Sequence, residues 1–207
     1  MPRNNSSVIK SSLRYRRIGA SAQSKSSAFP VIFIDRDGVI NVDPIGDYIK
    51  SWKDFRFETG ALEALKKITA YGYEIIIISN QAGIGDNVYP EDQLWDIHKN
   101  MLKVFAKEGI RVSAGIYCLH GKDEGCNCRK PQIGLFKEAA KHILFNTSNT
   151  FFIGDKVSDV LAGKRFGLKT IMVLTGHGKY EEKLAVGSMK PTHKAKNLLD
   201  AVKFLKR

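Results

Sequence analysis

The chain has 207 residues, of which 43% are hydrophobic and 26% charged, a composition typical of a soluble globular domain with a full hydrophobic core. No apolar run approaches the roughly 20 residues that a membrane span needs, so we expect no membrane contact. The net charge is +12. Residues 1–28 carry six basic and no acidic side chains, and residues 179–207 carry eight basic against three acidic, so the middle of the chain is nearly neutral.

Residues 1–28 contain eight serines and little hydrophobic patterning, which predicts a basic, mostly disordered tail ahead of one domain over 29–207. Arg- and Ser-rich, acid-free N-termini also resemble organelle targeting segments, which is the alternative for this stretch. Charge gathered at two ends is explained by a solvated tail and a Lys-rich last helix. A nucleic-acid partner would require a basic face on the folded body, so the sequence argues against one.

Apolar and amphipathic segments alternate along residues 29–207. Short β-branched runs predict strands at 31–34, 74–78, 114–119, 150–153 and 170–174. Between and after them, spaced apolar residues predict helices at 60–71, 90–108, 131–144, 157–166 and 196–206. This alternation is typical of an α/β three-layer sandwich around a central parallel sheet. The one longer insertion, residues 42–58, suits a short hairpin or flap, so no large cap domain is expected.

Several well-known nucleotide-binding and hydrolase motifs are missing from the sequence. It contains no Walker A loop, no G-x-G-x-x-G fingerprint and no G-x-S-x-G nucleophile elbow. These absences weigh against ATPase, dinucleotide-dependent and serine-hydrolase functions.

Polar and charged side chains follow four of the predicted strands, where a parallel sheet brings its strand ends to one edge. They are Asp35 and Asp37, then Ser79-Asn80-Gln81, then Arg129-Lys130, then Asp155, Lys156 and Asp159. Carboxylates held close together raise one another's pKa unless a cation joins them, and oxygen-only ligands favour Mg²⁺. A lysine and small hydroxyl or amide donors beside that ion suit a phosphoryl group. The pattern therefore predicts phosphoryl-transfer chemistry at this edge.

The three cysteines lie in one 11-residue window as Cys118-x-His120-x5-Cys126-x-Cys128. An odd, clustered set argues against a disulfide framework and favours a reducing, cytoplasmic setting. Three thiols and one imidazole are a standard ligand set for structural Zn²⁺, although Cys-x-Cys is tighter than the usual spacing. The alternative is a group of reduced thiols beside a surface histidine.

Four motifs in order, D-R-D-G-V-I-N, S-N-Q-A-G-I, C-R-K-P and G-D-K-V-S-D, resemble the haloacid dehalogenase-like phosphatases over residues 31–178. The closest likeness is to the branch that contains heptose bisphosphate and histidinol phosphatases, in which the zinc loop (118–130) also occurs. The resemblance implies a HAD-like Rossmannoid fold with a zinc-braced loop, an Mg²⁺ ion and an aspartyl-phosphate intermediate.

The resemblance also implies a role for each matching residue. Asp35 would be the nucleophile and a metal ligand. Asp37 would act as acid and base and offer its carbonyl oxygen to the metal. Lys130 would bridge nucleophile and phosphate. The acids that would complete the Mg²⁺ site are Asp155 and Asp159. The residues that would contact the substrate are Ser79, Asn80, Gln81, Arg129 and Lys156.

The substrate is expected to be a small phosphorylated metabolite handled by a monomer. The residues that frame the motifs favour D-glycero-D-manno-heptose 1,7-bisphosphate, with loss of the 7-phosphate. The short spacer between His120 and Cys126 is typical of histidinol phosphatases, so histidinol phosphate is the alternative, with other sugar phosphates open. From a different class, a nucleic-acid-binding zinc module using the basic ends is the weaker hypothesis.

Overall fold

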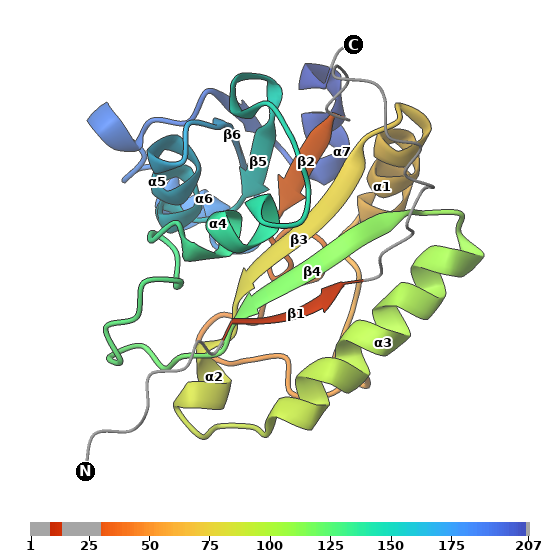
Figure 1. Ribbon diagram of the computed structural model, residues 1–207, viewed down its shortest axis with the longest axis vertical. Helices are drawn as coiled ribbons and strands as arrows, with labels where there is room; N and C mark the ends of the chain where they lie inside the picture. The colour runs from red at the N-terminus through yellow and green to blue at the C-terminus, as the bar shows by residue number, and fades with distance from the viewer. Residues whose placement is uncertain (1–8, 14–29, 206–207) are drawn as a thin grey trace.

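A computed structural model describes residues 9–13 and 30–205. Its centre is a seven-stranded sheet with the order β1-β4-β3-β2-β5-β6-β7 (Figure 1). Strands β2 to β7 are parallel to one another, and β1 pairs antiparallel with β4 at one edge. The strands are β1 Ile9–Leu13, β2 Val31–Ile34, β3 Glu74–Asn80, β4 Val112–Cys118, β5 Phe151–Gly154, β6 Lys169–Val173 and β7 His193–Ala195.

Helices cover both faces of the sheet, as the sequence predicts. One hydrophobic cluster joins the sheet to α1, α3 and α7, and a second joins its other face to α4 and α5. The helices are α1 Ala61–Ala70, α2 Ala82–Gly85, α3 Glu91–Lys107, α4 Gly134–Ala140, α5 Val157–Arg165, α6 Gly178–Glu181 and α7 Leu198–Ala201; 3-10 turns span Thr147–Asn149, Gly187–Met189 and Val202–Phe204.

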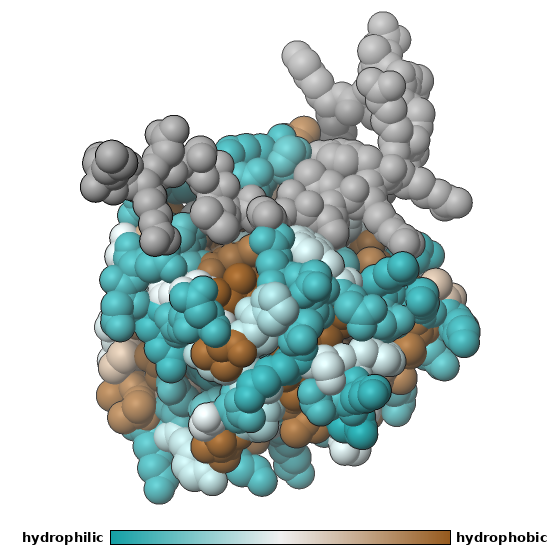
Figure 2. Space-filling model, turned by 90° about the horizontal axis from the view of Figure 1, so that it is seen from below, coloured by the Kyte–Doolittle hydropathy of each residue, from teal (hydrophilic) through white to brown (hydrophobic). Residues whose placement is uncertain are grey.

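Burial on both sides explains why the central strands are continuously apolar. All four residues of β2 are buried, and their side chains alternate between the two clusters, with Ile32 on one face and Phe33 on the other. On the face shown in Figure 2, hydrophilic residues predominate and hydrophobic ones form smaller separate groups. Among the described residues, none of the helices combines the length and apolarity that crossing a membrane requires.

The structure differs from the sequence prediction at several element boundaries. The helices predicted at 131–144 and 196–206 shorten to α4 and α7. Strand β7 was not predicted, because His193-Lys194-Ala195 is a polar edge strand without an apolar run. Residues 79–85 were expected to form a turn. Instead, β3 extends to Asn80, and the helix α2 follows at 82–85. Residues 42–58 form no regular hairpin, and an Asn41–Phe57 bridge ties the ends of this flap together.

Residues 9–13 were predicted to belong to a disordered tail, but they form strand β1. Residues 9–13 pair with β4 from Ile9 beside Cys118 to Leu13 beside Ala114. Without this strand, β4 would be the edge of the sheet and its backbone groups would be unpaired. Such an edge readily pairs with an extended segment, whatever side chains that segment carries. The rest of the tail, 1–8 and 14–28, lies outside the described residues.

Candidate active site

Three buried carboxylates meet at the carboxyl ends of two central strands. Asp35 follows β2, Asp155 follows β5, and Asp159 lies in the first turn of α5. Because β2 and β5 are hydrogen-bonded in parallel, their ends are adjacent, and each residue offers an oxygen within 4.8 Å of the others. Asp155 is completely buried and the other two nearly so. The structure thus brings together the acidic residues that the strand-end pattern predicts.

Lys130 is the positive charge within this cluster. Its Nζ lies 2.6 Å from Asp35 Oδ2 and 2.7 Å from Asp159 Oδ1. The other oxygen of Asp35 accepts a hydrogen bond from the Arg36 backbone N–H at 2.8 Å. Burial raises the pKa of Asp35 to about 6, although the Lys130 charge acts in the opposite direction. One ammonium therefore serves two acids, and the cluster keeps an excess of negative charge.

Asp155 has an oxygen that nothing in the described structure satisfies. Its Oδ2 accepts the His177 backbone N–H at 2.8 Å, but its buried Oδ1 has no partner. Burial and the nearby Asp159 raise the pKa of Asp155 well above its usual range. A side chain at Gly38 would collide with this carboxylate, which explains the glycine at that left-handed position (φ 80°). An unpartnered carboxylate oxygen among buried acids fits a hard divalent cation.

The Asp37 carboxylate stands apart from this cluster and is held by donors. Arg36 donates to both of its oxygens, Asn41 Nδ2 donates at 3.0 Å and Gln81 Nε2 at 2.7 Å. Burial alone would raise the pKa of Asp37, but the Arg36 charge and these hydrogen bonds outweigh it and hold the pKa below its usual value. In this arrangement Asp37 is ionised, the form in which a carboxylate can accept a proton.

The three residues at the end of β3 have different surroundings. The buried Ser79 hydroxyl lies 3.5 Å from Asp37 Oδ2. Asn80 exchanges two hydrogen bonds with the backbone of Lys130, at 2.9 and 3.1 Å, and thereby holds the lysine's loop against the sheet. Gln81 uses its side-chain amide entirely within the protein, on Asp37 and Ser79. The predicted substrate contact by Gln81 stays a prediction, and the hydrogen bonds of its side chain go to protein groups.

The two predicted basic contacts lie on either side of the cluster. Arg129 is half-buried, and its Nη1 has no partner among the described residues. Lys156 Nζ lies 3.1 Å from Asp43 Oδ2 on the flap, and His177 Nε2 lies 3.2 Å from the same oxygen. Burial acts to lower the pKa of Lys156, but Asp155 and Asp43 together raise it well above its usual value. Asp43 thus ties the flap to the strand ends.

Sequence reasoning did not assign four residues that the structure places at the site: Arg36, Asp43, Tyr89 and His177. Arg36 was detectable, because a basic residue between two candidate catalytic acids seldom lacks a carboxylate partner. Asp43 and Tyr89 gave no such signal, because they reach the site from loops whose path the sequence does not define.

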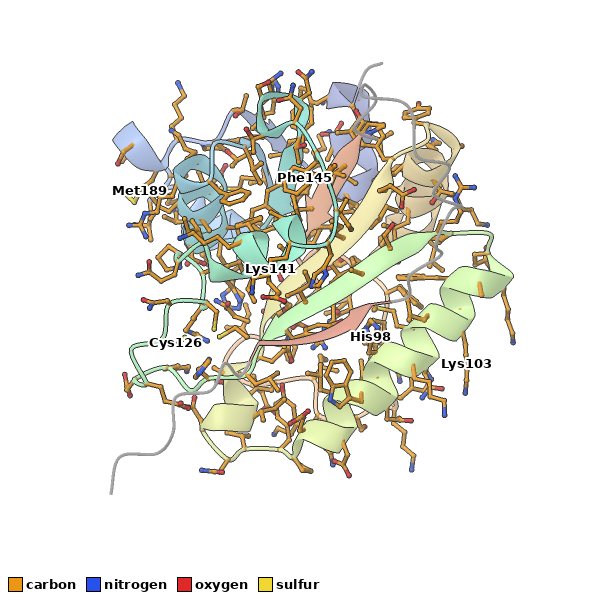
Figure 3. All side chains as sticks on the ribbon, viewed as in Figure 1. His98, Lys103, Cys126, Lys141, Phe145 and Met189 are labelled. Atoms are coloured by element: carbon orange, nitrogen blue, oxygen red, sulfur yellow. The ribbon has the colours of Figure 1, made fainter. Side chains whose placement is uncertain are left out.

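The cysteine loop gathers its four predicted ligands. The Cys118, Cys126 and Cys128 sulfurs lie 3.2–3.7 Å apart, and His120 Nδ1 lies 3.1 Å from Cys128 Sγ. Three Zn–S bonds of about 2.3 Å in a tetrahedral site would place the sulfurs roughly 3.8 Å apart, so the group fits that ion after slight expansion. Figure 3 shows Cys126 on the loop after β4, which leads directly to Arg129 and Lys130.

Known proteins share this sequence and fold. The HAD-hydrolase-like family model matches residues 127–201. D-glycero-beta-D-manno-heptose-1,7-bisphosphate 7-phosphatase of Pasteurella multocida is 34% identical over 182 residues, 84% of this chain and 96% of the relative. The bifunctional histidine biosynthesis protein HisB of Campylobacter jejuni is 34% identical over 140 residues, 67% of this chain and 40% of that protein.

A solved structure agrees with these relatives. The D,D-heptose 1,7-bisphosphate phosphatase of B. bronchiseptica, crystallised with magnesium and phosphate, superposes with a TM-score of 0.80 at 28% identity. The match covers 85% of this chain and 97% of that one. Together with the strand-end carboxylates and Lys130, these matches identify the family: the chain belongs to the haloacid dehalogenase-like phosphatases and is a phosphoric monoester hydrolase.

Proposed function

We propose that the protein is a Mg²⁺-dependent phosphatase that transfers a phosphoryl group from a small metabolite to Asp35 and then to water. The observation that carries this proposal is the buried Asp35–Lys130 pair at 2.6 Å beside the unpartnered Oδ1 of Asp155. The magnesium and phosphate bound by the B. bronchiseptica phosphatase support it.

The residues that would hold Mg²⁺ are Asp35, Asp155 and the backbone carbonyl of Asp37. Asp159 lies within reach of the same position, but it already contacts Lys130, and it accepts the Lys156 backbone N–H at 3.0 Å. We therefore assign it to holding Lys130 and to contact with the ion through water. When bound, the metal neutralises charge on the nucleophile and the phosphoryl oxygens.

In the first half-reaction, a carboxylate oxygen of Asp35 forms a bond to phosphorus, and the bond from phosphorus to the ester oxygen breaks. Asp37 gives its proton to the departing oxygen, which leaves as an alcohol. The negative charge of an arriving phosphate raises the pKa of Asp37, which allows it to carry that proton. Lys130, the Ser79 hydroxyl and the Asn80 backbone N–H stabilise the charge on the transferring group.

In the second half-reaction, water attacks the phosphorus of the Asp35 acyl phosphate. Asp37, now ionised, accepts a proton from that water, the phosphorus–Asp35 bond breaks, and inorganic phosphate leaves. The hydrogen bonds that keep Asp37 ionised in the free enzyme hold it in the unprotonated form that this step requires. Asp37 thus donates and accepts one proton in each cycle.

We propose a structural Zn²⁺ at Cys118, His120, Cys126 and Cys128. A hydrogen bond from the Cys128 thiol lowers the pKa of Cys118 to about 5, so this group readily supplies the thiolate that such an ion requires. The site has no open position for substrate chemistry. Its role would be to hold the loop that carries Arg129 and Lys130, with Arg129 contacting the substrate.

For the substrate we propose D-glycero-D-manno-heptose 1,7-bisphosphate, cleaved at the 7-phosphate. The support is the near full-length match to the Pasteurella multocida enzyme. Histidinol phosphate is the second candidate, because HisB is equally identical over a shorter stretch and the cysteine spacer is short. The free thiols fit a reducing cytoplasm, where we expect the enzyme to act as a monomer.

The test is phosphate release from both anomers of heptose 1,7-bisphosphate, histidinol phosphate and other sugar phosphates, with Mg²⁺ and with EDTA. We expect turnover that requires Mg²⁺ and is lost in Asp35→Asn. The matched control is Asp96→Asn, which alters an exposed acid on α3. Turnover that survives in Asp35→Asn would refute the mechanism, and a clear preference for histidinol phosphate would overturn the substrate.

A further inference from the structure

Gln81 is a buried amide whose four hydrogen bonds all stay inside the protein. Its Nε2 donates to Asp37 Oδ2 at 2.7 Å and to Ser79 Oγ at 2.9 Å. Its Oε1 accepts from Arg36 Nη2 at 3.1 Å and from the Tyr89 hydroxyl at 2.7 Å. Only 2% of the residue is exposed. Every donor and acceptor of the amide is used, which fixes its orientation without any contact to a substrate.

Tyr89 secures this amide from the loop between α2 and α3. Burial raises the pKa of the Tyr89 phenol, so its hydroxyl remains a donor. That donation requires the oxygen of Gln81 to face Tyr89 and therefore directs Nε2 toward Asp37. The Tyr89 ring lies 5.9 Å from the ring of Tyr48 on the flap, and a side chain at Gly83 would collide with it. The packing thus holds Tyr89 in place from two sides.

We propose that Gln81 and Tyr89 are positioning residues for the acid–base carboxylate: Tyr89 orients the Gln81 amide, and that amide aims Asp37 at the departing oxygen and at the attacking water. This inference rests on the proposed function, because it concerns the proton transfers of that reaction. It also reassigns Gln81, which the sequence pattern placed among the substrate contacts.

The experiment compares two substrates that differ in their need for a proton. A sugar phosphate releases a poor leaving group that requires protonation by Asp37, whereas 4-nitrophenyl phosphate releases a phenolate that leaves without it. In Gln81→Leu, we expect kcat/KM for the sugar phosphate to fall by about 10- to 100-fold, the usual effect of losing an outer contact to a reactive group. For the aryl phosphate, the same substitution should cost at most about threefold, because Asp37 is not needed there.

Two further variants separate positioning from packing. Tyr89→Phe keeps the ring and removes only the donor, so kcat on the sugar phosphate should fall by about 3- to 10-fold while KM changes little. Gln81→Glu keeps the size and the acceptor for Tyr89. In its ionised form, at a pH above the range in which the two carboxyls share a proton, it cannot donate to Asp37, so its loss there should equal or exceed that of Gln81→Leu. The control is Tyr73→Phe, which alters a buried tyrosine at the opposite end of β3 and should leave both substrates unaffected.

Equal losses on both substrates, or full sugar phosphate turnover by a folded Gln81→Leu, would overturn the inference. An ionised Gln81→Glu variant milder than Gln81→Leu at the same pH would indicate a packing role and would also overturn it. If Gln81→Leu fails to fold, the activities of Gln81→Glu and Tyr89→Phe test the inference instead. If wild-type protein does not hydrolyse the aryl phosphate, the test is whether the variants lose kcat on the sugar phosphate while KM is unchanged. Failure of the proposed function is distinguishable, because wild-type protein with Mg²⁺ would then release no phosphate from any sugar phosphate.

Discussion

The Lys130 ammonium lies between the Asp35 and Asp159 carboxylates, 2.6 Å from one and 2.7 Å from the other, and all three side chains are almost completely buried. With Asp155 beside them, this is a cluster of three acids and one base. Lys130 reaches the cluster from the end of the cysteine loop, and Asn80 holds its backbone. The cysteine loop, the strand ends and Asp35 thus form one connected unit.

Replacing Lys130 by methionine should impair both catalysis and stability. The substitution leaves Asp35 and Asp159 without their positive partner, and breaking such a buried pair costs about 3–5 kcal/mol. We expect kcat to fall by about 10²- to 10³-fold, the usual effect of removing one charge-stabilising donor. Thermal unfolding without metal should occur at a lower temperature, and Mg²⁺ should restore part of the loss.

Lys137→Met is the matched control, because that lysine is exposed and lies on α4, a different element from those that carry the carboxylates. It should change neither kcat nor the unfolding temperature. A Lys130→Met protein with wild-type kcat would show that Lys130 is not part of the catalytic site.

Measured as the difference between wild-type protein and Asp35→Asn, the stability of the metal-free protein should rise as the pH falls from 8 to 5. The comparison is needed because the lowered pKa of the Cys118 thiol acts in the opposite direction in both proteins. The pKa of Asp35 is about 6 in the folded chain against an ordinary value of 3.8, so the folded state binds the proton more tightly between these values. Each unit of pKa is worth 1.36 kcal/mol, which makes the contribution of Asp35 about 3 kcal/mol. This stabilisation is fully present below pH 3.8 and is lost as the pH rises through 6. The raised pKa of Asp155 likewise stabilises the folded state at low pH.

Mg²⁺ should reverse this trend, because the ion binds the ionised carboxylates. We expect its stabilising effect, measured by thermal unfolding at fixed Mg²⁺ concentration, to weaken as the pH falls below about 6. In Asp155→Asn, both the gain at low pH and the Mg²⁺ effect should shrink. If the unfolding temperature of metal-free wild-type protein, taken relative to that of Asp35→Asn, rises from pH 5 to pH 8, the assignment is contradicted.

Removing zinc should disturb the site through the loop rather than through the chemistry. In Cys126→Ser we expect loss of bound zinc, faster proteolysis within 119–130 and a kcat reduced by about 10- to 100-fold. Asn127→Ser changes the neighbouring exposed residue and should leave zinc content and activity intact. If Cys126→Ser lost its zinc and kept full activity, the bracing role would be wrong.

Two glycine substitutions separate backbone strain from crowding of Asp155. Gly38 and Gly109 both have positive φ values, 80° and 70°, so alanine at either should cost about 1–2 kcal/mol. A Cβ at Gly109 would meet nothing within 4 Å, whereas one at Gly38 would collide with the Asp155 carboxylate. Both variants should unfold at a lower temperature, but only Gly38→Ala should lose Mg²⁺ affinity and turnover. Equal Mg²⁺ affinity in the two would argue against Asp155 as a ligand.

Much of this protein can be predicted from its sequence, because the relevant signals are local. Continuous apolar runs such as Ile75–Ile78 identify strands buried on both faces, and alternation with helices makes the sheet parallel. A parallel sheet gathers its strand ends at one edge, so the sequence alone predicts that Asp35 and Asp155 meet there. The cysteine spacing likewise predicts the ligand cluster.

Only the tertiary structure decided what each side chain at that edge contacts. Gln81 belongs to a motif that suggests substrate binding, but Tyr89 and Arg36 turn its amide toward Asp37. Asp43 reaches Lys156 from the flap, and residues 9–13 join β4 because its edge offers unpaired backbone groups. These contacts join segments distant in sequence, and their energies depend on burial and hydrogen-bond geometry. Composition and periodicity determine which elements form, whereas packing determines which groups remain available to a ligand.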